Sequence, residues 1–236
     1  MRMKLLPAVC GAALLAAAAA MPASAGTLQV NPVLLEINAG RRTATVTLRN
    51  QEAVPVTIRA YPLAWRQDGG DESYDETSAV IVSPPIFTIA PGATQLVRVG
   101  LRTPSVAPQA YRLIIEEVPE ASPTDGIRVA LRLNLPLYSH LRAGEAAALR
   151  WTSWQEVDGS WALEAVNAGT GYVRVNHDAA QAATGLRLGD HVSFGTVLPG
   201  AARRWRIGTG LDVSDPARFR RIARTQDRVG AQASRD

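Results

Sequence analysis

The chain has 236 residues, with 25 Lys and Arg against 21 Asp and Glu, and a single cysteine. One cysteine excludes an internal disulfide framework, and the small positive excess is far from the basic footprint of a nucleic-acid-binding domain. The length is sufficient for one large hydrophobic core or for two modest ones.

The first 25 residues have the pattern of a cleavable export signal. Arg2 and Lys4 precede an apolar run at 5–20, and an Ala-Ser-Ala cleavage motif ends at Ala25. The apolar run is too short for a membrane span, and Cys10 lies far from the position of a lipoprotein cysteine. We therefore expect cleavage near Ala25, which leaves an exported chain without thiols and with 23 Arg against 21 acids.

The next part of the chain, up to residue 143, alternates apolar and polar residues with a period of two. Val, Ile, Leu and Thr are enriched, and Gly, Pro, Asn and Asp separate the runs. This pattern predicts strands rather than helices. The predicted strands cover 27–37, 42–50, 54–65, 78–82, 86–89, 93–101, 110–118 and 126–140. Short strands in this number and spacing predict an antiparallel sandwich.

Two loops in this part carry specific expectations. The acidic, Gly-rich segment 68–76 does not have the spacing of an EF-hand loop, so a solvated hairpin is favoured over a calcium site. The Ser83-Pro84-Pro85 segment interrupts an apolar run. A cis peptide bond is therefore expected before one of its two prolines.

After residue 143 the composition changes, and residues 143–146 are predicted to form a hinge. Short β-like segments follow at 149–151, 160–167, 171–176, 184–194 and 202–208. Four of the five Trp residues lie here, and such side chains suit a small core. The predicted organisation is a signal at 1–25, a first domain at 26–143, a smaller domain at 144–212, and a last strand or disordered tail at 213–236.

The sequence gives little support for catalysis. His140, His177 and His191 are not spaced as metal ligands, and the chain has neither a Gly-x-Ser-x-Gly elbow nor a Gly-rich phosphate loop. We therefore predict no enzyme, no metal site and no cofactor. Because the residues of a Ser-His-Asp triad can be far apart in the sequence, an enzyme or metal-binding protein on a β scaffold remains an alternative.

The segment at 126–138 is the most informative part of the chain. Six large apolar residues alternate along it and share one face of an extended strand: Ile127, Val129, Leu131, Leu133, Leu135 and Leu137. Such a strand can cover its own core. Its length, its position at the domain boundary and Pro136, which suits an edge, favour a strand that is added to the incomplete sheet of a partner.

Five further motifs occur in an order that resembles the periplasmic pilus-assembly chaperones of the chaperone–usher pathway. The similarity covers most of 27–140 and, more weakly, 147–208. Each motif is weak alone, but their order before the apolar strand is specific. They are Val30-Asn31-Pro32, Thr45–Asn50, Val82–Pro85 followed by Ile89–Gly92, Leu96–Val99, and Tyr111–Pro119.

The resemblance implies two immunoglobulin-like β-sandwich domains set at an angle in the periplasm. It implies pilin subunits as partners, whose sandwiches lack a strand, and an outer-membrane usher that receives them. Neither a nucleic acid, nor a cofactor, nor membrane insertion is implied. By position, the strand donated to the subunit carries Ile127, Val129, Leu131, Leu133 and Leu135.

One departure from the family pattern concerns the anchoring of the subunit's terminal carboxylate. Many members carry an Arg and a Lys at the positions of Leu34 and Pro136, and neither residue here can pair with a carboxylate. We therefore expect other contacts to hold the subunit, with His140 or Arg132 as candidates, as in the archaic, Csu-like branch. The alternative is a secreted immunoglobulin-like adhesin or pilus subunit, which the intact set of strands disfavours.

Overall fold

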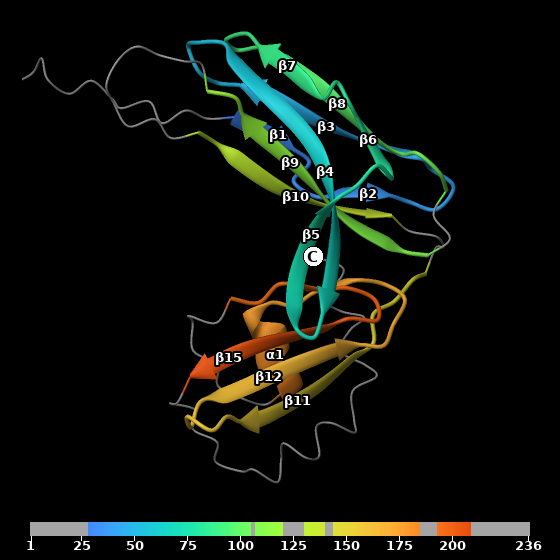
Figure 1. The fold of residues 1–236 in the computed structure, drawn as a ribbon, viewed down its shortest axis with the longest axis vertical. Coiled ribbons are helices and arrows are strands. Elements are labelled where there is room, and N and C mark those ends of the chain that lie inside the picture. Colours follow the sequence, from blue (N-terminus) through green and yellow to red (C-terminus); the bar gives the residue numbers. More distant parts are fainter. Residues whose placement is uncertain (1–27, 105–106, 120–129, 140–143, 185–192, 209–236) are drawn as a thin grey trace, which may run out of the picture.

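The computed structural model describes residues 28–104, 107–119, 130–139, 144–184 and 193–208. They form two β units that lie at an angle to each other (Figure 1). The predicted all-β class with two units is confirmed. The expected signal at 1–25, with its cleavage motif, lies outside the described residues, as does the expected tail at 213–236. Within the described part of the chain, no helix is long and apolar enough to cross a membrane.

The first unit is a sandwich of two sheets. One sheet has the strand order β1-β3-β8-β6, and the other has the order β2-β10-β9-β4-β5, with β7 also pairing with β4. The strands of the first sheet are β1 (Leu28–Asn31), β3 (Thr43–Asn50), β8 (Thr94–Leu101) and β6 (Val80–Ser83). Those of the second are β2 (Leu35–Ile37), β10 (Arg132–Ser139), β9 (Gln109–Glu117), β4 (Val56–Asp68), β5 (Asp71–Glu76) and β7 (Ile86–Ile89).

The core of this sandwich follows from the alternation in the sequence. In β3, Val46 and Leu48 are fully buried, while the alternating residues Thr45 and Thr47 point away from the core. The two sheets contribute facing layers of such residues, and burying each large one stabilises the fold by roughly 1.5–3 kcal/mol. The largest fully buried members are Leu35, Ile37, Val46, Leu48, Ile58, Val97, Val99, Leu113, Ile115 and Leu137.

The predicted single strand at 27–37 is wrong. β1 pairs antiparallel with β3, whereas β2 pairs parallel with β10 in the opposite sheet. Pro32 lies between the two strands, after a cis peptide bond, and proline has no backbone N–H for a ladder. The chain therefore changes sheets here. The cis bond expected near Pro84 is confirmed at Ser83–Pro84.

The second unit is smaller and is built around tryptophan. Its three-stranded sheet consists of β11 (Leu149–Gln155), β12 (Trp161–Asn167) and β15 (Ala202–Gly208). The strands β13 (Val173–Arg174) and β14 (Thr196–Val197) pair with each other, and α1 (His177–Thr184) follows β13. The rings of Trp151 and Trp205 stack in the core with centroids 5.9 Å apart. The strand predicted at 184–194 is wrong at its start, because Thr184 ends α1.

The β4–β5 hairpin joins the two units (Figure 1). β5 itself is exposed, as expected for the acidic segment 68–76, but the hairpin tip is not free in solvent. Gly70 forms a parallel bridge with Arg203 on β15, and Glu72 forms an ion pair with Arg203. The hairpin thus fixes the second unit against the sheet that contains β10.

Candidate functional site

β10 is paired along its whole length on one side only. It runs antiparallel to β9 from Arg132, opposite Glu116, to Ser139, opposite Gln109. On its other side, β2 pairs with Leu137–Ser139 alone. Among the described residues, no strand pairs with that side of β10 from Arg132 to Pro136. Free backbone donors and acceptors at such an edge are a template for a further strand.

The apolar side chains of β10 point into their own sandwich. Leu137 is fully buried and Leu135 is 6% exposed, opposite the buried Leu113 of β9. The expectation that Leu135 is donated to a partner is therefore corrected, because its side chain already fills the internal core. Leu133 is only partly buried against that core, and Leu131 is half-buried at the start of the strand.

Two of the residues predicted to be donated, Ile127 and Val129, lie outside the described residues, as does His140. The backbone pairing of the strand continues one residue beyond β10, because the N–H of Glu117 donates to the carbonyl of Leu131 at 2.9 Å. The described part of the candidate site therefore begins at Leu131, where the alternating segment joins the sheet.

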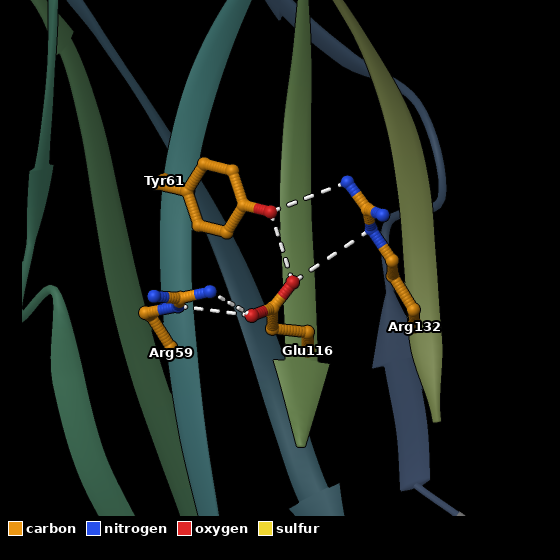
Figure 2. A network of polar contacts seen from close by, with 4 residues as sticks. All are labelled: Arg59, Tyr61, Glu116 and Arg132. Carbon is orange, nitrogen blue, oxygen red and sulfur yellow. Dashed lines mark hydrogen bonds and ion pairs between the residues drawn. The ribbon is translucent and has the colours of Figure 1, made fainter. Parts of the chain in front are cut away.

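The outer face of this sheet carries a polar network that links three strands (Figure 2). Glu116 of β9 accepts hydrogen bonds from the guanidinium of Arg59 and, at 2.9 Å, from the hydroxyl of Tyr61, both on β4. Arg59 bonds Oε1 of Glu116, whereas Oε2, which accepts from Tyr61, also lies 3.7 Å from Nε of Arg132, the first residue of β10. Arg132 also donates to the Tyr61 hydroxyl at 3.3 Å.

The network keeps Glu116 ionised. The hydrogen bonds from Tyr61 and Arg59 lower the pKa of the Glu116 carboxyl, and the charges of Arg59 and Arg132 act in the same direction. Burial and the bond to Glu116 raise the pKa of Tyr61, so that its hydroxyl stays protonated as a donor. Arg132, a candidate contact for the subunit, is thus held against its own sheet beside the free edge.

The two positions of the missing ionic anchor lie together. Leu34 is 39% exposed and directly precedes β2. Leu35 pairs with Leu137, and Leu34 and Pro136 are the residues directly before these two partners. The cross-strand partner of Pro136 on β9 is Arg112, whose guanidinium lies 3.6 Å from the centre of the Trp65 ring.

Sequence reasoning missed Arg112 and the network around Glu116. Both residues lie in the segment Tyr111–Pro119, where arginine and glutamate alternate with apolar residues and resemble ordinary solvated positions. Their neighbours come from β4 and β10, which are distant in sequence. The only available signal was the pair of adjacent acids Glu116 and Glu117 at the end of an apolar strand.

The described residues offer no group of three His, Cys, Asp or Glu side chains placed to hold a metal ion. His177 lies in the first turn of α1, where its Nδ1 is 3.9 Å from Asp178, and His191 lies outside the described residues. The free side of β10 can form backbone hydrogen bonds with a further strand, and the apolar side chains before it can be buried against that strand's sheet.

Comparisons with known proteins agree with this geometry. Residues 27–140 match the family described as pili and flagellar-assembly chaperone, PapD N-terminal domain. The chain is 29% identical over 150 residues to the chaperone protein FimB/FhaD of Bordetella pertussis, and the match spans 58% of this chain and 59% of that relative.

Two solved complexes share the fold. The first is the CsuC–CsuE chaperone–tip subunit pre-assembly complex of the archaic Csu pili of Acinetobacter baumannii. It has a TM-score of 0.62 and 23% identity, and the alignment covers 77% of this chain and 87% of that one. The second is the Salmonella enterica SafA pilin bound to the SafB chaperone, with a TM-score of 0.55, 16% identity, and coverage of 77% and 84%.

Proposed function

We propose that the chain is a pili-assembly chaperone, which binds pilus subunits in the periplasm and passes them to an outer-membrane usher, because residues 27–140 match the PapD N-terminal domain of that family. Two structures with a similar fold are complexes of a chaperone with a tip subunit and with a pilin, which supports a subunit as the partner. The export signal expected at 1–25 supports the periplasmic location. Membership of the archaic branch stays a prediction.

The observation that carries this proposal is the free edge of β10. Its side away from β9 offers backbone groups from Arg132 to Pro136, directly after an alternating apolar segment. A subunit whose sheet lacks a strand would pair with this edge and gain the missing strand. We propose Ile127, Val129, Leu131 and Leu133 as the donated residues, with Leu135 excluded because it is part of the internal core.

Burial supplies the energy for such a complex. One large apolar side chain moved from water into a groove contributes roughly 1.5–3 kcal/mol. Four such side chains and the added strand pairing exceed the lower estimates of the association cost, which are about 4 kcal/mol. Binding and release of a subunit therefore need no chemical step in the chaperone.

The test is co-expression of the tagged chain with a pilin subunit from the same genome, followed by capture from the periplasm. Leu131→Glu places a charge in the proposed donated face at a half-buried position. We expect this variant to lose the subunit while its melting temperature stays close to that of the wild type. Leu133→Glu should also lose the subunit, with some loss of stability, because Leu133 packs partly against the core.

Ile81→Glu is the matched control, since Ile81 is 45% exposed on the edge strand β6 of the other sheet. It should capture as much subunit as the wild type. Equal capture by the Leu131→Glu variant would refute the donor role. Failure of the wild-type chain to retain any pilin would refute the chaperone function itself.

A further inference from the structure

Two adjacent carboxylates hold the first residues of the edge strand from opposite faces of the sheet. Glu116 contacts Arg132 on the outer face, as Figure 2 shows. Glu117, whose side chain points the other way because strand residues alternate, accepts a hydrogen bond of 3.4 Å from the N–H of Leu131. The backbone N–H of Glu117 donates in turn to the carbonyl of Leu131. The strand is therefore fixed at the point where the alternating segment joins β10.

The apolar residues of this strand do not define their own register. Leu131, Leu133, Leu135 and Leu137 are identical and are spaced by two. A shift of two residues would place one leucine where another had been, so the core would lose little contact. Such a shift would nevertheless displace the whole donated segment by about 7 Å along the edge. Something other than leucine packing must select one register.

Tyr138, which stacks on Tyr172, restrains the far end of the strand, and the polar residues around Glu116 provide the selection at the end where the alternating segment begins. In the observed register Arg132 lies opposite Glu116. A shift of two residues would place Ala130 or Asn134 there, and neither carries a positive charge. A shift of one residue would turn leucines out to the solvent face. Of these registers, only the observed one gives the Glu116 carboxylate a cation from β10.

The network around Glu116 is also more than an isolated surface pair. The Glu116 side chain is 19% exposed, whereas Arg59 and Arg132 are 52% and 60% exposed. A single exposed ion pair contributes little to stability, but this carboxylate joins three strands through two arginines and one tyrosine. Its contribution is therefore to geometry, since each partner restricts where the others lie.

We infer that Glu116 is a positioning residue that sets the register of the donated strand, and so decides which apolar side chains face the subunit, while Glu117 holds the backbone of the strand at Leu131. This inference rests on the proposed function, since it concerns the same strand. It assigns no contact between either acid and the subunit. Their effect passes through Arg132 and Leu131 to the donated residues.

Engineered cysteine pairs can read the register directly, because the only natural cysteine is Cys10 within the expected signal. Arg112→Cys with Pro136→Cys joins directly opposed residues and should form a disulfide in the native register. Arg112→Cys with Asn134→Cys should form one only after a shift of two residues, because diagonal neighbours lie about 7–8 Å apart. Each pair is compared with and without Glu116→Gln plus Glu117→Gln.

We expect the shifted disulfide to rise several-fold in the double Gln background and the half-life of the subunit complex to fall several-fold. Glu116→Gln alone is the milder variant in case the double variant unfolds. The matched control is Glu164→Gln, since Glu164 is 22% exposed and pairs with Arg204, itself 50% exposed, in the second unit. It should change neither readout.

An unchanged disulfide pattern in both Gln backgrounds would overturn the register inference. The disulfide assay needs no subunit, so it gives its answer even when no pilin is captured. Loss of capture by the wild-type chain would thus refute the chaperone function alone. A shifted register with an unchanged complex half-life would overturn the claim that register governs binding.

Discussion

The side-chain carbonyl of Gln67 accepts a hydrogen bond of 2.9 Å from the backbone N–H of Leu198, across the junction of the two β units. The amide of the same side chain donates to the carbonyl of Thr196 at 2.8 Å. Gln67 therefore pairs with the backbone of the second unit as a neighbouring strand would. Close by, the Tyr138 hydroxyl donates to Thr196, and its ring stacks on Tyr172 at 3.6 Å.

This junction predicts that Gln67→Ala loosens the second unit. The substitution leaves one backbone N–H and one carbonyl without these partners, which costs about 1–3 kcal/mol for a buried group. We expect a lower melting temperature and a broader distribution of domain angles in small-angle scattering. Gln51→Ala, which removes one exposed bond to Gln29, should change neither. Unaltered scattering from the Gln67 variant would contradict the role of the hairpin.

Gly70, which bridges to Arg203 on β15, gives a second test of the junction between the two units. It has φ of 97°, and a Cβ added to it would lie 3.0 Å from Cβ of Arg204. We expect Gly70→Ala to displace the hairpin tip and to weaken the Glu72–Arg203 pair, which amide exchange at β15 would report. Gly69→Ala is the control, because Gly69 also has a positive φ, of 59°, but an added Cβ meets nothing within 4 Å. Equal exchange in both variants would rule out the steric explanation.

Each unit contains one buried asparagine at the end of a strand that organises the following loop. The amide of Asn50 donates to the carbonyls of Val54 and Ile89, and that of Asn167 donates to the carbonyls of Gly171 and Val197. Both side chains are fully buried. We expect Asn50→Ala and Asn167→Ala to lower the unfolding free energy by at least about 1–3 kcal/mol each. Urea denaturation measures this, and a loss below 0.5 kcal/mol, about the effect of a neutral surface change, would contradict it.

The Glu116 network predicts a pH dependence of stability. Hydrogen bonds from Tyr61 and Arg59 lower the pKa of the folded Glu116 carboxyl below its ordinary value. The stabilisation is therefore fully present above the unfolded pKa of about 4.3, and it is lost as the pH falls through the lower folded pKa. We expect the melting temperature of the Glu116→Gln variant to fall less at acid pH than that of the wild type. The Glu164→Gln variant, which keeps Glu116, should show the steeper fall. Parallel curves for the two variants would refute this assignment.

The position of Leu34 leads to a prediction about the proposed subunit complex, because the Arg and Lys of many pilus chaperones are absent here. We expect Leu34→Ala to weaken the proposed subunit complex through lost packing, because the exposed Leu34 directly precedes the Leu35–Leu137 pair at the end of the free edge. The effect should depend little on salt, which surface plasmon resonance at several NaCl concentrations measures. A steep salt dependence of the wild-type complex would contradict apolar anchoring and point to Arg112, which lies across from Pro136.

The sequence by itself determined the β class, most strand positions and the division into two units. It did so because period-two alternation places Val46 and Leu48 on one face of a strand wherever that strand pairs. The order of short motifs also predicted the family whose N-terminal domain residues 27–140 match. Such local and ordered features need no knowledge of which strands are neighbours.

Only the tertiary structure decided what each face touches. It divided 27–37 between two sheets, buried Leu135 against Leu113, placed the acidic hairpin tip on β15, and joined Glu116 to Arg59, Tyr61 and Arg132. Alternation reveals that a strand has two faces, but pairing between distant segments sets which face is covered and in what register. Pro136 suggested an edge strand from the sequence, but only the folded chain showed which side of β10 is free and which acids lie beside it.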